Sequence, residues 1–186
     1  MKFIPLEIPD VILIEPSLVE DSRGFFYESY REDVFSRNGI GVRFVQDNHS
    51  RSARGVLRGL HYQIPPKAQA KLIRVTQGEI FDVAVDIRKA SSTFGKSVVV
   101  HLSDRDKKML YIPAGFAHGF CTLQDGTEVL YKTSEFYSPT HERGILWSDP
   151  DLAIPWPKLG AEYSLSPKDS AFPAFKKACA LNHIFP

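Results

Sequence analysis

Residues 71–87 read KLIRVTQGEIFDVAVDI and carry the clearest structural signal in the chain. The runs LIRV and EIFDVAVDI are rich in β-branched and aromatic residues, a composition typical of strands. Between them lies Thr76-Gln77-Gly78, a short segment with a glycine that allows a sharp change of direction. The stretch therefore predicts two consecutive strands joined by a tight turn.

Similar short apolar runs, separated by turn residues, recur along the chain. They predict further strands at 11–14, 25–30, 42–46, 56–62, 97–102, 108–112, 119–122 and 129–137. Short helices are expected only at 31–38, closed by Gly39, and within 167–180. Together these segments predict an all-β fold, an antiparallel sandwich or barrel with a few short helices. No repeat or linker divides residues 1–186, so we expect one domain, with a tail from about residue 156 wrapping the barrel.

The overall composition excludes several classes of protein. The 23 basic and 22 acidic residues leave a formal charge of +1, which argues against a general nucleic-acid binder. Cys121 and Cys179 are the only cysteines and form no CxxC motif, so a reducing cytoplasm is expected. No apolar run is long enough for a signal sequence or a membrane span.

Two histidines follow strand-like or turn-like segments. His61 ends the run VLRGLH, and His118 follows the turn PAGFA. Each is compatible with a hydrogen-bonded core histidine. Imidazole also titrates near neutral pH, so either residue is a candidate for proton transfer.

The surroundings of the two histidines resemble the motifs of cupin barrels. Residues 55–61 carry a glycine followed by a histidine at the cupin spacing, and residues 113–118, PAGFAH, match the second motif. However, Gln63 replaces the second histidine, and the expected glutamate falls on Lys67 or Ala68. Since two imidazoles rarely hold a catalytic metal alone, this pattern favours metal-independent chemistry.

Charged residues also occur within the strongest strands. Lys71 has the same parity as Ile73, so it shares a face with apolar side chains unless it reaches water at the strand end. A buried ammonium needs an anion nearby. Asp82, within the apolar run 80–85, is a candidate partner for a cation.

The predicted strand 129–137 places Tyr131, Thr133, Glu135 and Tyr137 on one face. Two tyrosines on one face are ordinarily core or rim aromatics. Their phenols also suit proton donation and their rings suit stacking.

The strand around His61 poses a problem of parity. Arg58 and His61 should face opposite sides of the sheet unless Gly59 forms a bulge.

The segment Ser166-Pro167-Lys168-Asp169 reads as a turn or a helix N-cap, and nothing local makes Asp169 catalytic.

Taken together, these segments resemble the family of dTDP-4-dehydrorhamnose 3,5-epimerases, which act in dTDP-L-rhamnose synthesis. The matching blocks span nearly the whole chain and follow the family's order: 21–26 (DSRGFF), 44–48 (FVQDN), 55–63 (GVLRGLHYQ), 69–88, 112–120 (IPAGFAHGF), 129–134 (VLYKTS) and 165–169 (LSPKD).

The resemblance implies a set of roles within a cupin-type jelly roll. His61 would accept a proton, Asp169 would order its imidazole, and Tyr131 would donate a proton to the opposite face of the sugar. Lys71 would stabilise an enolate oxygen, and Tyr137 would stack on thymine. The remaining implied substrate contacts are Arg23, Glu28, Gln46, Asp47, Asn48, Arg58, His118, Glu142 and Lys168.

The resemblance also implies a cytoplasmic homodimer that needs no cofactor or metal, and whose N-terminal strands complete the neighbour's site. Related enzymes invert only C3 or only C5, so a mono-epimerase is an alternative. Two other hypotheses propose a different kind of function. One is a metal-dependent cupin enzyme built on His61 and His118, and the other is a non-catalytic module that binds a sugar or nucleotide.

Overall fold

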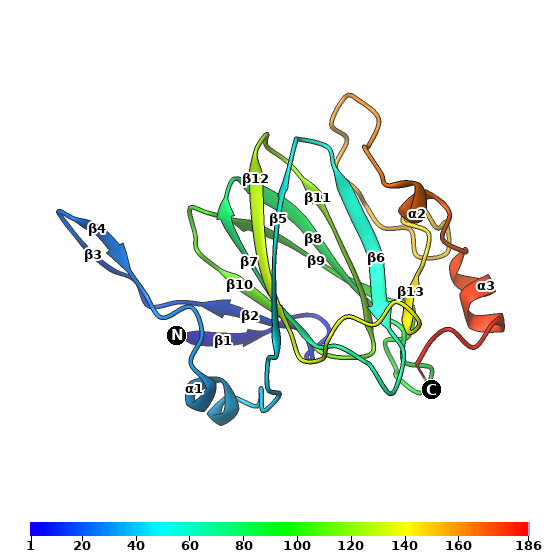
Figure 1. The fold of residues 1–186 in the computed structure, drawn as a ribbon, viewed down its shortest axis with the longest axis horizontal. Helices are drawn as coiled ribbons and strands as arrows, with labels where there is room; N and C mark the ends of the chain where they lie inside the picture. The colour runs from blue at the N-terminus through cyan, green and yellow to red at the C-terminus, as the bar shows by residue number, and fades with distance from the viewer. Residues whose placement is uncertain (186) are drawn as a thin grey trace.

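Two antiparallel sheets face each other in the computed structural model, which describes residues 1–185 (Figure 1). The six-stranded sheet has the order β1 (Lys2–Pro5), β2 (Ile12–Glu15), β10 (Met109–Ile112), β7 (Lys71–Gln77), β12 (Thr127–Thr133), β5 (Gln46–Ser52). The five-stranded sheet has the order β13 (Glu142–Gly144), β6 (Leu57–Gln63), β11 (Phe116–Thr122), β8 (Glu79–Asp86), β9 (Ser97–Ser103). The predicted all-β sandwich is confirmed.

Alternating side chains fill the space between the sheets. Ile73, Val75 and Val129 from the six-stranded sheet pack against Ile80 and Ala84 from the five-stranded sheet. This packing follows the two-residue period of a strand, which sends every second side chain to the same face. The same period sets which polar residues of these strands point inward.

The two strands predicted within 71–87 are confirmed as β7 and β8, but they do not pair with each other. β7 lies between β10 and β12 in one sheet, whereas β8 lies between β11 and β9 in the other. The chain changes sheet at Gly78, whose φ of +80° is in the region that favours glycine. A Cβ there would lie 2.5 Å from Thr127 Oγ1, so the turn is a tight corner between the sheets.

Several predicted boundaries are wrong. The segment 42–45 is irregular and the strand begins at Gln46. The strand predicted at 25–30 is shortened to β4 (Gly24–Phe26), and the one at 129–137 ends at Thr133. The strands β1, β3 (Val19–Asp21) and β13 were not predicted.

Helices are short, as the sequence indicates. α1 (Glu32–Arg37) ends before Gly39, which has a φ of +86° as expected for a residue after a helix. The predicted segment 167–180 contains two helices, α2 (Pro167–Ser170) and α3 (Phe175–Ala180). No helix among residues 1–185 is long and apolar enough to cross a membrane.

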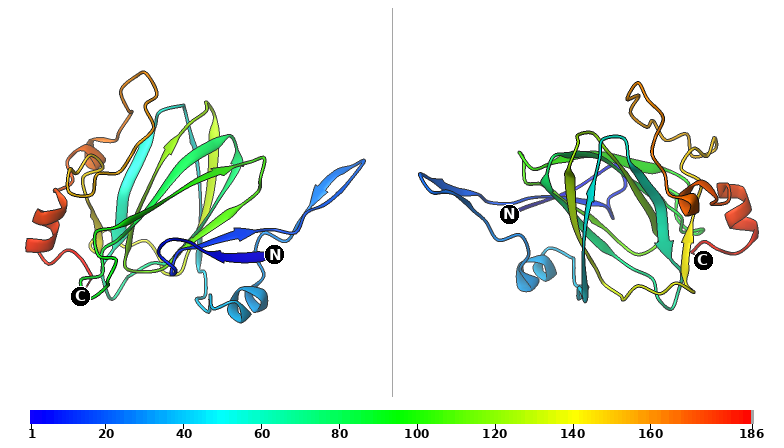
Figure 2. Two further views of the ribbon diagram at one scale, coloured as in Figure 1. Left: turned by 180° about the vertical axis from the view of Figure 1, so that it is seen from behind. Right: turned by 45° about the horizontal axis from the view of Figure 1, so that its top comes forward.

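Two parts of the chain lie outside the sandwich. The hairpin of β3 and β4, here called the arm (residues 19–26), projects away from the sheets in every view (Figures 1 and 2). The C-terminal segment packs on the outer face of the five-stranded sheet, where Trp156, Tyr163 and Phe175 contact an apolar cluster that includes Phe81. The arm touches the body through Phe25, whose ring centroid lies 4.3 Å from Lys107 Nζ, whereas the C-terminal segment packs on the sheet over a broad apolar cluster.

Candidate active site

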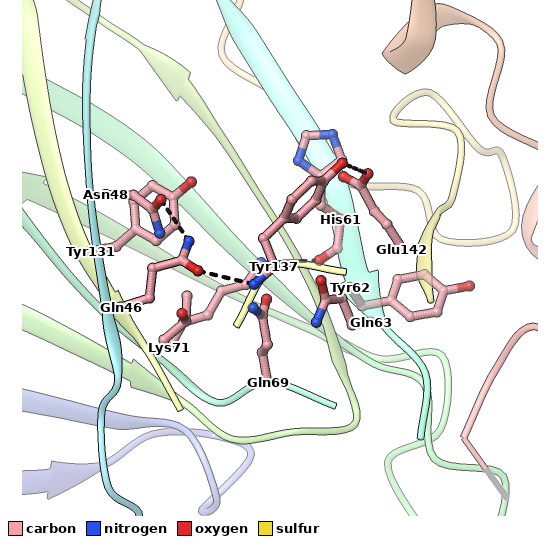
Figure 3. A pocket seen from close by; sticks show the side chains of 11 residues that line it. Gln46, Asn48, His61, Tyr62, Gln63, Gln69, Lys71, Tyr131, Tyr137 and Glu142 are labelled. Carbon is pink, nitrogen blue, oxygen red and sulfur yellow. Dashed lines mark hydrogen bonds between the residues drawn. The ribbon is translucent and has the colours of Figure 1, made fainter. Parts of the chain in front are cut away.

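A pocket opens between the two sheets, beside the edge strand β5 and its neighbour β12 in one sheet and beside β6 in the other (Figure 3). Its walls come from β5, β6, β7 and β12 and from the loop after β12. The lining residues are Gln46, Asn48, His61, Tyr62, Gln63, Gln69, Lys71, Tyr131, Thr133, Tyr137 and Glu142. A second cavity shares His61, Lys71 and Tyr131 with this pocket and is also lined by Ser50, Arg58, His118 and Phe120.

His61 on β6 is joined to Asp169 on α2. The distance from His61 Nε2 to Asp169 Oδ1 is 2.6 Å. Asp169 is buried, and its backbone N–H donates to the side chain of the N-cap residue Ser166 at 3.1 Å. Burial raises the pKa of Asp169, but hydrogen bonding and charge interaction with His61 outweigh it and the net pKa is lowered. Asp169 is therefore a carboxylate in hydrogen-bond contact with the imidazole.

A bulge in β6 resolves the parity of Arg58 and His61. His61 is opposite His118 on β11, but Arg58 is opposite Phe120, so the register shifts between them. Gly59 has a φ of +137° at this point. Both side chains consequently line the second cavity, which settles the question that the sequence left open.

Lys71 lies on the inner face of β7, as its parity predicts. It is only 8% exposed, and its Nζ donates a hydrogen bond to His61 O at 3.2 Å. Burial lowers the pKa of Lys71 to about 8, against the opposing charges of Asp82 and Glu142. An ammonium in this position is available to a developing negative charge in the pocket.

Tyr131 extends from β12 in the opposite sheet. Figure 3 shows its phenol and the imidazole of His61 on opposite sides of the pocket, with Lys71 between the two strands that carry them. Burial raises the pKa of Tyr131, more than the charge of Arg58 lowers it. The phenol is therefore protonated at neutral pH and can donate.

A second buried histidine–carboxylate pair lies beside Lys71. His118 Nε2 is 3.0 Å from each oxygen of Asp82, and both side chains are buried. Burial lowers the pKa of His118 despite this carboxylate. Because a carboxylate only accepts, Nε2 carries the hydrogen and Nδ1 is left as an acceptor. The sequence predicts a cation as the partner of Asp82, but its hydrogen-bond partner is instead the neutral imidazole of His118.

Polar contacts surround the mouth of the pocket. Tyr137 Oη donates to Glu142 Oε2 at 2.7 Å, and Glu142 forms an ion pair with Lys168. Burial raises the pKa of Glu142, but the hydrogen bonds from Lys168 and Tyr137 lower it by more than burial raises it. The net pKa is below the usual value, so Glu142 is a carboxylate. Gln46 accepts a hydrogen bond from Tyr137 N at 3.0 Å and donates one to Asn48 at 2.9 Å. Tyr137 comes from the loop after β12 rather than from the predicted strand.

Three predicted substrate contacts lie away from the pocket of their own chain. Arg23 is at the tip of the arm, where its side chain pairs with Asp21. Glu28 is exposed beside Arg31. Asp47 points outward from β5, and its carboxylate accepts a hydrogen bond from Lys132 at 2.9 Å. A single chain therefore does not assemble the full predicted set.

Gln63, which replaces a cupin metal ligand, supports the wall of the pocket. Its Nε2 donates to Lys67 O at 2.6 Å, and its Oε1 accepts from Ser138 N at 2.7 Å. The sequence did not predict this role of Gln63, nor that Ser50 lines the second cavity, although the alternation along β5 indicates that Ser50 faces inward. In the described part of the chain, 1–185, no three His, Cys, Asp or Glu side chains gather as metal ligands.

Comparisons with known proteins agree with one another. A family model described as dTDP-4-dehydrorhamnose 3,5-epimerase matches residues 5–177. The enzyme of that name from Pseudomonas aeruginosa is 57% identical over 179 residues, which cover 96% of this chain and 98% of the relative. The enzyme of that name from Shigella flexneri is 60% identical over 158 residues, covering 84% and 87%.

Solved structures are similar over almost the whole length. A Legionella pneumophila epimerase in complex with dTDP-4-keto-L-rhamnose has a TM-score of 0.94 and 47% identity, covering 99% of this chain and 97% of the other. A 3′-monoepimerase from Streptomyces bikiniensis in complex with dTDP-quinovose has a TM-score of 0.90 and 36% identity, covering 97% and 91%.

Proposed function

The chain belongs to the dTDP-4-dehydrorhamnose 3,5-epimerase family, and on this premise we propose how its residues invert C3 and C5 of dTDP-4-keto-6-deoxy-D-glucose. The observation that carries the proposal is the placement of His61 and Tyr131 in opposite sheets, with Lys71 beside them in the same pocket. Epimerisation next to a ketone needs a base on one face of the carbon and an acid on the other.

His61 acts as the base. A hydrogen on C3 or C5 is acidic because loss of the proton gives an enolate with the charge on the ketone oxygen at C4. The carboxylate of Asp169, 2.6 Å from Nε2, leaves Nδ1 of the imidazole to take the proton and stabilises the imidazolium that forms. A positioned base of this kind contributes roughly 10²–10⁴-fold to the rate.

Lys71 and Tyr131 complete the reaction. The buried ammonium of Lys71 stabilises the enolate oxygen where negative charge develops. The protonated phenol of Tyr131 then returns a proton to the carbon from the other face. The enolate collapses to the ketone, and the carbon is inverted with no net oxidation. The imidazolium of His61 then releases its proton to solvent and the phenolate of Tyr131 takes one up, so the pair is ready for the second carbon. No step in this sequence draws on a metal or a redox cofactor.

The mouth of the pocket binds the nucleotide end of the substrate. The ring of Tyr137 is half exposed, so one face is free to stack on a base. Lys168, Arg58 and the amides of Gln46 and Asn48 offer donors to the diphosphate and sugar. Glu142 holds Lys168 and Tyr137 in place.

The deciding experiment is turnover in D₂O. The protein is incubated with dTDP-4-keto-6-deoxy-D-glucose, and deuterium at C3 and C5 is followed by NMR. We expect incorporation at both carbons; a chain that binds the nucleotide sugar but incorporates no deuterium is a binding module instead. Incorporation at one carbon identifies a mono-epimerase, the activity of the Streptomyces bikiniensis relative.

Two controls accompany that assay. His61→Ala is expected to remain folded and to lose exchange at both carbons, and near-wild-type exchange contradicts its role as base. Metal analysis of the purified active protein tests the cupin alternative: a stoichiometric metal whose removal abolishes turnover would replace the proposed mechanism.

A homodimer is part of the proposal. The arm exposes Val19, Phe25 and Phe26, and the pocket mouth exposes Phe136 and Tyr137. Exposed apolar groups of this size favour burial against another surface. In a two-fold dimer each arm reaches the partner's pocket, which brings Arg23 to the diphosphate. The unpaired cysteines suit the reducing cytoplasm, where we place the enzyme.

A further inference from the structure

Ser50 lies on the wall of the substrate cavity without an assigned role. Along β5, Gln46, Asn48 and Ser50 face inward, because alternate residues of a strand share a face. In the register with β12, Asn48 is opposite Tyr131 and Ser50 is opposite Val129. Ser50 is therefore the next inward position beyond the proton donor.

The hydroxyl of Ser50 has no partner within the protein. Its Oγ is buried and makes no hydrogen bond to any group of residues 1–185. Ser52, two residues further on the same face, differs because its Oγ accepts hydrogen bonds from Arg58 at 3.1 and 3.3 Å. A buried hydroxyl without a partner costs stability, and such groups in native proteins usually serve a purpose.

The cavity around Ser50 is suited to a ring substituent of the sugar. It is continuous with the groups that act on the ring, since it shares His61, Lys71 and Tyr131 with the main pocket. Phe120 supplies an apolar wall, whereas Ser50 supplies a hydroxyl that both donates and accepts. A 4-keto-6-deoxyhexose carries both kinds of group, a methyl at C5 and hydroxyls at C2 and C3.

We propose that Ser50 hydrogen-bonds a ring hydroxyl of the 4-keto sugar and so fixes the ring between His61 and Tyr131. The inference rests on the proposed epimerase function. It predicts an unusual combination: removal of the hydroxyl leaves folding intact, because no protein contact is lost, but weakens catalysis.

The test compares Ser50→Ala and Ser50→Cys with wild type. The alanine variant removes the hydroxyl, and the cysteine variant keeps a side chain of similar shape with a much weaker hydrogen bond. Both should lower kcat/KM for the keto sugar by roughly 3- to 10-fold, the loss of one hydrogen bond. The Tm should be unchanged or higher, and the affinity for dTDP alone should equal that of wild type.

Matched controls make each outcome decisive. Ser97→Ala, on the edge strand β9, should leave kcat/KM unchanged. If both Ser50 variants turn over like wild type, or if kcat/KM falls only together with Tm, the proposal is overturned. A parallel loss of dTDP affinity also overturns it, because the hydroxyl then binds the diphosphate. If the wild type itself does not turn over the keto sugar, the proposed epimerase function is wrong. That result differs from a failure of the Ser50 proposal alone, in which the wild type is active and the Ser50 variants are equally active.

Discussion

Lys71 and His118 are buried nitrogen bases in the same cavity, and burial lowers the pKa of both. The consequences differ. The pKa of His118 falls below its already near-neutral value, so the residue is neutral and acts as a fixed polar group held by Asp82. The pKa of Lys71 falls from a much higher value to about 8, so the ammonium persists at neutral pH. Similar burial thus yields one neutral contact and one positive charge.

The pKa of Lys71 predicts an alkaline limit to catalysis. The charged form exists below the pKa, so the proposed stabilisation of the enolate by Lys71 should operate at pH 7 and be lost as pH rises through about 8. In a profile of kcat/KM against pH, we expect a decline above this value. In the Lys71→Arg variant the guanidinium stays charged at all these pH values, so the remaining activity should not decline above pH 8. If kcat/KM declines above pH 8 in the same way in the wild type and in Lys71→Arg, another group is responsible for the decline.

Single residues differ in how far the sequence predicts them. The parity of Lys71 with Ile73 correctly predicts an inward ammonium, because strand geometry alone decides it. The contact between His61 and Asp169 joins residues 108 positions apart, and no local pattern encodes it. Only the family resemblance pointed to that pair.

At the scale of elements, the bulge in β6 is the feature on which the site depends. A regular strand would turn either Arg58 or His61 to the outer face. The shift opposite β11 sends both inward and brings the backbone of Gly59 against Gly119. From the sequence, a bulge at Gly59 was only one of two alternatives for Arg58 and His61. The sequence did not indicate that β7 and β8 belong to different sheets. A glycine with positive φ, such as Gly78, suits both a hairpin turn within one sheet and a connection between two sheets.

Gly59→Ala is expected to distort this element. An added Cβ would lie 2.5 Å from Gly119 Cα, and the φ of +137° is unfavourable for alanine. We expect a loss of roughly 1–3 kcal/mol in the free energy of unfolding from backbone strain, with additional loss from the clash. Activity should fall because His61 moves with the strand. Urea unfolding and the exchange assay measure the two effects.

Gly41→Ala is the matched control for that variant. A Cβ at Gly41 meets nothing within 4 Å, and its φ lies outside the left-handed region. The substitution should leave activity unchanged and stability equal or slightly higher. If Gly59→Ala behaves in the same way, the bulge does not position His61.

At the scale of the molecule, the near-neutral total charge conceals a local distribution. Lys71 and Arg58 line one cavity, and Lys168 lies at its mouth. Arg23, in contrast, is exposed on the arm, where it pairs with Asp21 and lines neither cavity. Composition predicted the absence of a general polyanion partner, but it carries no information about which residues meet. The position of Arg23 follows from the projecting arm, which no periodicity in the sequence indicates.

A complementation experiment tests whether the arm completes the partner's site. Arg23→Ala and His61→Ala should each be inactive as homodimers, because each site then lacks one group. In a mixed dimer, the Arg23→Ala chain contributes an intact His61, and the arm of the other chain supplies Arg23. One site per mixed dimer is then complete, so random re-assortment should restore about a quarter of the wild-type sites.

The result distinguishes arms that act in trans from arms that act in cis. If the arm folded back to its own pocket, no combination of the two chains would rebuild a site, and the mixture would stay inactive. Sedimentation of the wild type and of Phe26→Ser provides the structural control. Phe26 is 70% exposed in the single chain, so a serine there should weaken the dimer without lowering the stability of the sandwich. Activity that is restored on mixing and lost on dilution would place Arg23 in the neighbour's site.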